Sequence, residues 1–323
     1  MSETIRSDKT WVLSYPDIFD FLPNPDLVSR TTKGEFEHQD ISKFTRLPGD
    51  GLMLESGILS RLTDDGKTII EATFFEHHDA WSVGREDSVH GVEFGTLGIL
   101  ASNGRMHEMP VAIKPFHLFR SGASNEAAAL LKVPEITSID SFELVGLIRS
   151  NGVLALITRF EEDVVSLDNV NWDMAIEASV KESFNVIEAL QKCALLLARM
   201  HQCEIVHNDA QVKNMAVARN HAGGAVLRLV DLENTKWRNT KDEPERQRYL
   251  DGIHSDVGAL IGSILAKGLW RNADYTDKAR AIEILFTEPY LSYLSHPSNR
   301  DDTYTPELHS EVEERVDDVL QQI

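Results

Sequence analysis

Residues 205–233 read IVHNDAQVKNMAVARNHAGGAVLRLVDLE, and they carry the clearest structural signals in the chain. A short apolar run ends at His207, Asp209 follows it, and Asn214 lies five residues further along. Two apolar segments flank a Gly-Gly pair, which predicts a β-hairpin that leads to Asp231. Asparagine and aspartate supply the hard oxygen ligands that Mg²⁺ prefers, and the first aspartate could orient a hydroxyl nucleophile. The stretch therefore predicts a metal site beside a nucleophile-orienting carboxylate.

Length and composition are those of a globular protein. The 323 residues suffice for one two-lobed domain with an appendage, or for two modest domains. The two cysteines, Cys193 and Cys203, bracket an apolar helical stretch and are expected to be small buried residues, since two thiols make no disulfide framework. The sequence shows neither an apolar signal core nor a run that could span a bilayer, so we expect a cytoplasmic protein without a membrane partner.

The chain carries a large acidic excess. Its 52 acidic and 32 basic residues give a formal net charge of -20. Such an excess opposes contact with a phosphate backbone, so we expect no nucleic-acid partner. It favours a cationic partner or substrate, or it forms a solvated acidic surface, and we prefer the solvated surface.

Residues 51–75 predict a second β-hairpin. GLMLESGILSRL and KTIIEATFF contain alternating apolar residues, and Thr63-Asp64-Asp65-Gly66 lies between them. Asp-Gly between two such runs is a hairpin signal. Glu76-His77-His78-Asp79 follows and has metal-ligand chemistry, but adjacent residues on a strand point to opposite faces. A polar loop is therefore the preferred interpretation of those four residues.

Residues 92–114 predict two strands joined by a turn at Ser102–Arg105. Gly95 and Gly98 form a G-x-x-G in the first strand, and Lys114 ends the second in Val-Ala-Ile-Lys. Glycine lets backbone N–H groups approach a phosphate closely, although a simple strand bend is the alternative. A lysine that ends an apolar strand is commonly just an exposed edge residue. The functional interpretation of Lys114 therefore depends on its occurrence together with the G-x-x-G and with residues 205–233.

Helices and further strands follow in order. A helix is predicted to begin at Ser124 and to stop before Pro134, with Glu126 in its first turn. Strands are predicted at 142–148 and 152–160, and helices at 184–202, from Ser255 onward and at 311–323.

Five motifs follow one another as in the protein-kinase superfamily: G-x-x-G, Val-Ala-Ile-Lys, a helical glutamate, His-x-Asp-x-x-x-x-Asn with Asp-Leu-Glu, and Ser-Asp-Val. Over roughly residues 90–265 the chain resembles an atypical member of that superfamily. The resemblance implies an α+β, bilobal protein-kinase-like fold with a mostly β N-lobe, a helical C-lobe and ATP between them. It divides the chain into a β-rich extension at 1–85, packed on the N-lobe and able to bind a partner protein, an N-lobe at 86–161 and a C-lobe at 162–323, truncated after the helix that contains Ser-Asp-Val.

The resemblance assigns the nucleotide site. Lys114 would hold the α- and β-phosphates of ATP, fixed by Glu126 (Glu135 is the weaker alternative because it follows the proline). Gly95 and Gly98 would lie against the phosphates. Thr158 occupies the gatekeeper position, and Arg159 to Glu161, including Phe160, would form the hinge that binds adenine through backbone groups.

The resemblance also assigns the transfer site. Asn214 and Asp231 would hold Mg²⁺, and Asp209 would accept a proton from, or orient, the attacking hydroxyl. Lys213 would neutralise the migrating phosphate, or it is simply a solvent-exposed lysine. Asp256 of Ser-Asp-Val would hold the catalytic loop through hydrogen bonds to its backbone.

Departures from the family pattern indicate an atypical kinase. Asn208 replaces the arginine that senses activation-loop phosphorylation, so that control is expected to be absent. Glu93 stands at the first phosphate-loop glycine, Asp-Leu-Glu replaces Asp-Phe-Gly, and no Ala-Pro-Glu follows. We therefore expect an ATP- and Mg-dependent phosphotransferase whose acceptor hydroxyl is on a protein or a small molecule. The alternative is a pseudokinase that binds a nucleotide or a partner without turnover.

Overall fold

The computed structural model divides the chain into two compact units. The first, here the β-rich unit, comprises residues 1–30, 39–131 and 142–162, and the second, here the helical unit, comprises 31–38, 132–141 and 163–323. This division into a mostly β and a mostly helical part agrees with the predicted α+β class. The residues that the structure describes are 11–14, 18–21, 51–55, 69–76, 92–101, 103–116, 120–137, 139, 141–150, 153–160, 164–169, 186–219, 225–238, 241–296 and 306–322.

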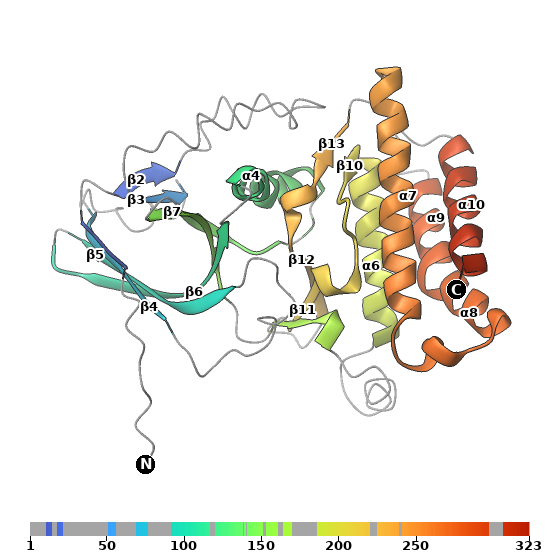
Figure 1. Ribbon diagram of the computed structural model, residues 1–323, viewed down its shortest axis with the longest axis horizontal. Helices are drawn as coiled ribbons and strands as arrows, with labels where there is room; N and C mark the ends of the chain where they lie inside the picture. Colours follow the sequence, from blue (N-terminus) through green and yellow to red (C-terminus); the bar gives the residue numbers. More distant parts are fainter. Residues whose placement is uncertain are drawn as a thin grey trace, which may run out of the picture. The chain divides into compact units, whose positions relative to one another are not determined.

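The β-rich unit is built on one eight-stranded sheet in the order β1-β4-β5-β6-β8-β7-β3-β2 (Figure 1). Neighbouring strands are antiparallel, except that β2 and β3 are parallel. The strands are β1 (Trp11–Ser14), β2 (Ile18–Phe21), β3 (Gly51–Glu55), β4 (Ile69–Glu76), β5 (Glu93–Ala101), β6 (Met106–Phe116), β7 (Leu144–Ser150) and β8 (Val153–Arg159).

The predicted hairpin at residues 51–75 is wrong in its pairing. Both strands form, but β3 pairs with β7 and β2, whereas β4 pairs with β5 and β1. Alternating apolar residues predict a strand but not its partner, and here each strand extends a different side of the central sheet. The segments 63–66 and 77–79, which carry the predicted turn and most of the predicted polar loop, lie outside the described residues.

The hairpin of β5 and β6 is confirmed. Its turn contains Gly104 at φ +77°, a conformation that favours glycine, and the Arg105 N–H donates to Oδ1 of Asn103 at 3.0 Å. Alternate residues of β6 are buried, with Val111 and Ile113 fully enclosed, so Lys114 is oriented to the opposite face.

Helix α4 (Arg120–Thr137) differs from its prediction at both ends. It begins before Ser124, and it continues through Pro134. Proline lacks the N–H that would bond one turn back, so its inclusion costs one helical hydrogen bond. The helix ends three residues later, where the Thr137 hydroxyl donates to the Val133 carbonyl.

The helical unit is organised around α6 (Val186–Gln202) and α7 (Glu243–Leu265), which lie beside α9 (Glu288–Ser295) and α10 (Pro306–Gln322) (Figure 1). Helix α6 packs on α9 and α7 packs on α10. Between α7 and α9 the chain forms a short helix at Gly268–Asn272, then α8 (Tyr275–Ile282) and one π-helical turn at Glu283–Thr287. Burial raises the pKa of the Cys193 thiol on α6 to about 12, so this thiol stays protonated and inert at neutral pH.

Helix α7 begins twelve residues before the predicted start at Ser255. Pro244 lies at the beginning of the helix, where its missing N–H is harmless, and Glu243 and Glu245 add favourable charges to the first turn. The apolar run predicts only the second half of the helix, because the polar first half has no apolar periodicity. Only the residues from 232 to 242 therefore separate Asp231 from α7.

Short strands of the helical unit position the loops. Strands β11 (Met215–Arg219) and β12 (Ala225–Leu229) form the hairpin predicted for residues 205–233, and β9 (Val164–Ser166) extends it. Strand β10 (Ile205–Val206) pairs with β13 (Lys236–Trp237). No helix among the described residues has the length and apolarity needed to cross a membrane.

Candidate active site

The loop that carries Asp209 is tied to helix α7. The backbone N–H of His207 donates to Oδ2 of Asp256 at 2.7 Å, and the N–H of Val212 donates to the Ser263 hydroxyl at 3.1 Å. Asp256 is fully buried. The first bond confirms the expectation that the aspartate of Ser-Asp-Val accepts a hydrogen bond from the loop backbone, and the two bonds together hold the loop on both sides of Asp209.

Asp209 and Asn214 are in direct contact. Nδ2 of Asn214 donates to the Asp209 carbonyl at 2.8 Å and to its Oδ2 at 2.9 Å, while Nε2 of Gln211 donates to Oδ1 at 2.7 Å. Nζ of Lys213 lies 3.5 Å from Oδ2, on a side chain that is 42% exposed. The side-chain nitrogen of Asn214 is thus used within the loop. The side-chain oxygen, Oδ1, is the atom that could bind a cation.

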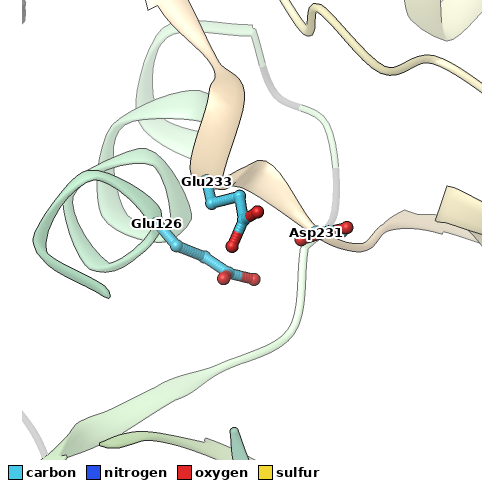
Figure 2. Close-up of side chains that lie close together, drawn as sticks. All are labelled: Glu126, Asp231 and Glu233. Carbon is cyan, nitrogen blue, oxygen red and sulfur yellow. The ribbon is translucent and has the colours of Figure 1, made fainter. Parts of the chain in front are cut away.

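The hairpin brings Asp231 to the same end as Asn214. Met215 at the start of β11 faces Leu229 at the end of β12, and the Val230 N–H donates to the Asn214 carbonyl at 3.0 Å. Asp231 follows in the left-handed conformation, with φ 58° and ψ 57°. Such a backbone costs a non-glycine residue roughly 1–3 kcal/mol and is common at functional sites. Figure 2 shows Asp231 and Glu233 on the segment that follows β12.

The donor set at this end of the hairpin fits a magnesium ion. One amide oxygen, from Asn214, and one carboxylate, from Asp231, are hard ligands of the kind that Mg²⁺ uses together with water and phosphate oxygens. The roles of Asp209, Lys213, Asn214 and Asp231 in catalysis and metal binding stay predictions, but the structure does gather the four residues at one place in the helical unit.

In the β-rich unit, Lys114 on β6 pairs with Glu126 on α4. Nζ lies 2.9 Å from Oε2, and the two side chains are 14% and 6% exposed. Nζ also lies 5.1 Å from the centre of the Phe116 ring, which adds a cation–π contact. Figure 2 labels Glu126 on α4. The partner of Lys114 is thus Glu126, the first of the two glutamates considered from sequence.

Gly95 and Gly98 lie inside β5, where both are buried. Gly95 faces Val111 on one side and Glu76 on the other, and Gly98 faces Glu108 and Thr73. Their backbone groups therefore point toward neighbouring strands and not into a loop. A role for these glycines against phosphates stays a prediction.

The predicted adenine site lies at the end of β8. Thr158 is half-buried and faces Ala112 on β6. The N–H of Phe160 donates to the Pro110 carbonyl at 2.9 Å, and its ring meets Phe94 edge to face with the centroids 5.2 Å apart. Glu161 lies outside the described residues. Adenine binding by this segment stays a prediction.

Two features of the site were missed by sequence reasoning. Asn208, at φ 62°, donates from Nδ2 to the Asn234 carbonyl at 2.7 Å, so it ties the loop to the segment after Asp231. His201 is buried and hydrogen-bonds to Tyr290 on one side and to Asp256 on the other. His201 lies near the end of the helix predicted at 184–202 and could have been singled out, but nothing in the sequence connects it with Tyr290, 89 residues further on.

The Lys–Glu pair of the β-rich unit and the Asp–Asn–Asp set of the helical unit consist of the residues that the resemblance to atypical kinases, phosphotransferases with a hydroxyl acceptor, singled out. A sequence model described as the lipopolysaccharide kinase (Kdo/WaaP) family matches residues 154–276. Over these residues the chain is thus similar to a family of atypical kinases, and its β-rich and helical units agree with the predicted α+β class.

Two further comparisons complete the findings. A solved structure described as "WaaP in complex with acyl carrier protein" is similar over 83% of this chain and 98% of that chain, at 17% identity and a TM-score of 0.40. The search of curated proteins finds no match.

Proposed function

We propose that this protein transfers the γ-phosphate of ATP, in the presence of Mg²⁺, to a hydroxyl group of a small saccharide or glycolipid. The observation that carries the proposal is the arrangement of Asp209, Asn214 and Asp231 at one end of the β11–β12 hairpin, because phosphoryl transfer needs a positioned nucleophile and a neutralised phosphate. The match to a family described by lipopolysaccharide phosphorylation supports a saccharide acceptor.

The short segment after Asp231 also favours a small acceptor. Eleven residues, 232 to 242, lead directly into α7, and they contain no Ala-Pro-Glu. Protein kinases use a longer segment here to support a peptide. A chain without it has less surface for a protein substrate, so a saccharide hydroxyl is the preferred acceptor.

The proposed mechanism assigns one task to each group. Asp209 hydrogen-bonds the acceptor hydroxyl and orients its oxygen toward the γ-phosphorus. A bond forms from that oxygen to phosphorus while the bond to the β–γ bridging oxygen breaks, ADP leaves, and the hydroxyl proton passes to Asp209 or to the phosphate. Asn214 and Asp231 would hold Mg²⁺, which supplies charge neutralisation at the phosphates. Lys114, fixed by Glu126, binds the α- and β-phosphates, and Lys213 lies beside Asp209 at the transferred group.

The proposal is tested with γ-labelled ATP and cell lysate separated into protein, lipid and small-molecule fractions, followed by purified lipopolysaccharide as a single acceptor. We expect label in the glycolipid or small-molecule fraction. Asp209→Asn and Asp231→Asn should each lower the rate at least about 100-fold, the usual contribution of a positioned general base or a metal ligand. Asp317→Asn removes an exposed carboxylate on α10 and should leave the rate unchanged.

Two outcomes would contradict the proposal. Label confined to the protein fraction would identify a protein acceptor. Binding of Mg·ATP without labelling of any fraction would identify a pseudokinase. The domain boundaries at 85 and 161, a partner protein bound through residues 1–85, and a cytoplasmic location stay predictions.

A further inference from the structure

Four buried groups form one hydrogen-bonded chain in the helical unit. The hydroxyl of Tyr290 on α9 lies 2.5 Å from Nδ1 of His201 on α6, and Nε2 of His201 lies 3.1 Å from Oδ2 of Asp256 on α7. The same oxygen accepts the His207 N–H of the catalytic loop. Tyr290, His201, Asp256 and His207 each have 0% of their surface exposed. No solvent therefore replaces a partner that one of these groups loses.

The direction of each hydrogen bond follows from the chemistry of the neighbours. Burial raises the pKa of the Tyr290 phenol well above its ordinary value, and the charges of Tyr249 and Asp256 raise it further, so the phenol keeps its proton. Among the described residues, the acceptor within reach of that proton is Nδ1 of His201. With Nδ1 accepting, the ring proton is on Nε2, where it donates to Asp256.

The other states of the ring leave a buried group unsatisfied. A proton on Nδ1 of the neutral ring would turn the lone pair of Nε2 toward the carboxylate of Asp256. An imidazolium would satisfy the carboxylate, but the Tyr290 hydroxyl would then have no acceptor among the residues that the structure describes. The neutral ring with its proton on Nε2 gives the Tyr290 hydroxyl an acceptor and Oδ2 of Asp256 a donor, and it leaves only Oδ1 of Asp256 without a partner among these three side chains.

This ring state matters for Asp209 because the loop between His207 and Asp209 is strained. Asn208 adopts φ 62°, in the left-handed region that few non-glycine residues occupy. The bond from the His207 N–H to Asp256 fixes one side of that residue. The hydroxyl of Tyr249 adds a bond to the His201 carbonyl, which holds the end of α6 in place.

We infer that Tyr290 is a positioning residue for phosphoryl transfer: its hydroxyl fixes the His201 tautomer, and that tautomer holds Asp256 and the catalytic loop in register. The inference rests on the proposed function. It gives α9, a helix far along the chain from the motif residues, a defined part in the reaction.

The first test compares Tyr290→Phe with Tyr293→Phe, two identical chemical changes on one helix. Phenylalanine at 290 keeps the ring stacked on Phe286, whose centroid is 5.1 Å away, and removes only the hydroxyl. We expect kcat to fall about tenfold, the effect of one lost buried hydrogen bond, with the KM for ATP within about twofold. Tyr293 faces Arg199 through its ring, so its variant should keep the wild-type kcat. Equal kcat values for the two variants would overturn the inference.

The second test asks whether donor and acceptor chemistry at position 201 suffices. In His201→Gln the side-chain N–H can donate to Asp256 and the amide oxygen can accept from Tyr290, whereas His201→Leu offers neither. We expect the glutamine variant to keep at least about ten times the kcat of the leucine variant. If the two variants are equally impaired, the role of His201 is packing and the inference is wrong.

The third test reads the ring directly by nitrogen NMR of the protein labelled with ¹⁵N-histidine, with His201→Gln used to assign the signal. The wild type should show a neutral His201 ring protonated on Nε2 at neutral pH, and Tyr290→Phe should show a mixture of tautomers. A wild-type ring that is charged, or protonated on Nδ1, would overturn the inference. Because no substrate is needed, this signal separates failure of the inference from failure of the proposed function.

Discussion

Lys114 is held from two sides within the β-rich unit. Its ammonium contacts the Glu126 carboxylate at 2.9 Å and the face of the Phe116 ring at 5.1 Å. Both charged side chains are largely buried, so their attraction is screened little by water, and the loss of one charge leaves the other without full compensation. The pair therefore contributes to stability as well as to the predicted phosphate site.

Replacement of Glu126 by glutamine tests this pair. We expect the free energy of unfolding to fall by about 1–3 kcal/mol, because a mostly buried ammonium loses its counter-charge, and the phosphotransfer rate to fall about tenfold. Urea unfolding and initial rates measure the two effects. Glu143→Gln in the same unit is the control: it breaks the pair with Arg159, whose side chains are 34% and 52% exposed, and should change stability by less than about 0.5 kcal/mol. Equal destabilisation by the two variants would contradict the argument.

Contacts between individual residues can be predicted from the sequence where both residues belong to short motifs that lie close together in the chain. The partner of Lys114 follows from one helix twelve residues away, and the loop that joins Asp209 to Asn214 lies within six residues. The chain of Tyr290, His201 and Asp256 could not be predicted in this way, because its contacts join residues 89 and 55 positions apart whose types suit an ordinary core equally well.

Among the elements, α7 contains three glycines, and two of them, Gly252 and Gly262, have opposite surroundings. A Cβ atom at Gly252 would lie 2.9 Å from two methyl groups of Val206 on β10, closer than real contacts allow. A Cβ atom at Gly262 would meet nothing within 4 Å. Glycine at 252 thus permits the close approach of α7 to the strand that leads into the loop with Asp209, while glycine at 262 only weakens the helix.

Alanine at each position gives a matched pair of variants. Gly252→Ala should lower the free energy of unfolding by about 1–3 kcal/mol through overpacking, and Gly262→Ala should raise it by about 0.5–1 kcal/mol through helix propensity. Thermal and urea unfolding measure both. The double variant Gly252→Ala, Val206→Ala should recover part of the loss, since the clash is with Val206. A neutral or stabilising Gly252→Ala would show that this contact is not what holds α7 close to β10.

Element prediction succeeded where the signal was local. The β5–β6 and β11–β12 hairpins pair as their turn residues predict, whereas the Asp-Gly between β3 and β4 predicts a pairing that does not form. The partners of β3 were not predicted because they depend on which edge of the sheet is open. The first half of α7 was not predicted because its polar residues show no apolar periodicity. Pro134 was a wrong stop signal because packing of α4 outweighed the lost hydrogen bond.

Across the whole molecule, the composition predicts net electrostatic repulsion among the acidic side chains. Ion pairs are present, such as Lys192–Glu188 at 2.7 Å and Lys267–Asp168 at 2.6 Å, and salt would weaken them. However, 52 acidic residues face 32 basic ones, so twenty carboxylates remain uncompensated even if every basic residue is paired. Exposed pairs contribute little, about 0–1 kcal/mol each, so screening of the acidic excess should outweigh their loss.

Salt should therefore stabilise this protein. Raising NaCl from about 10 mM to about 150 mM shortens the screening length from about 30 Å to about 8 Å, so repulsion across each compact unit is removed while contacts at a few ångströms persist. We expect the Tm to rise by several degrees in this range and little beyond it, as measured by calorimetry at constant pH. Sucrose at equal osmolality is the control for non-ionic effects of the solute and should not reproduce the saturating rise. A Tm that falls with NaCl would mean that the ion pairs outweigh the acidic excess, contrary to the balance argued from the composition.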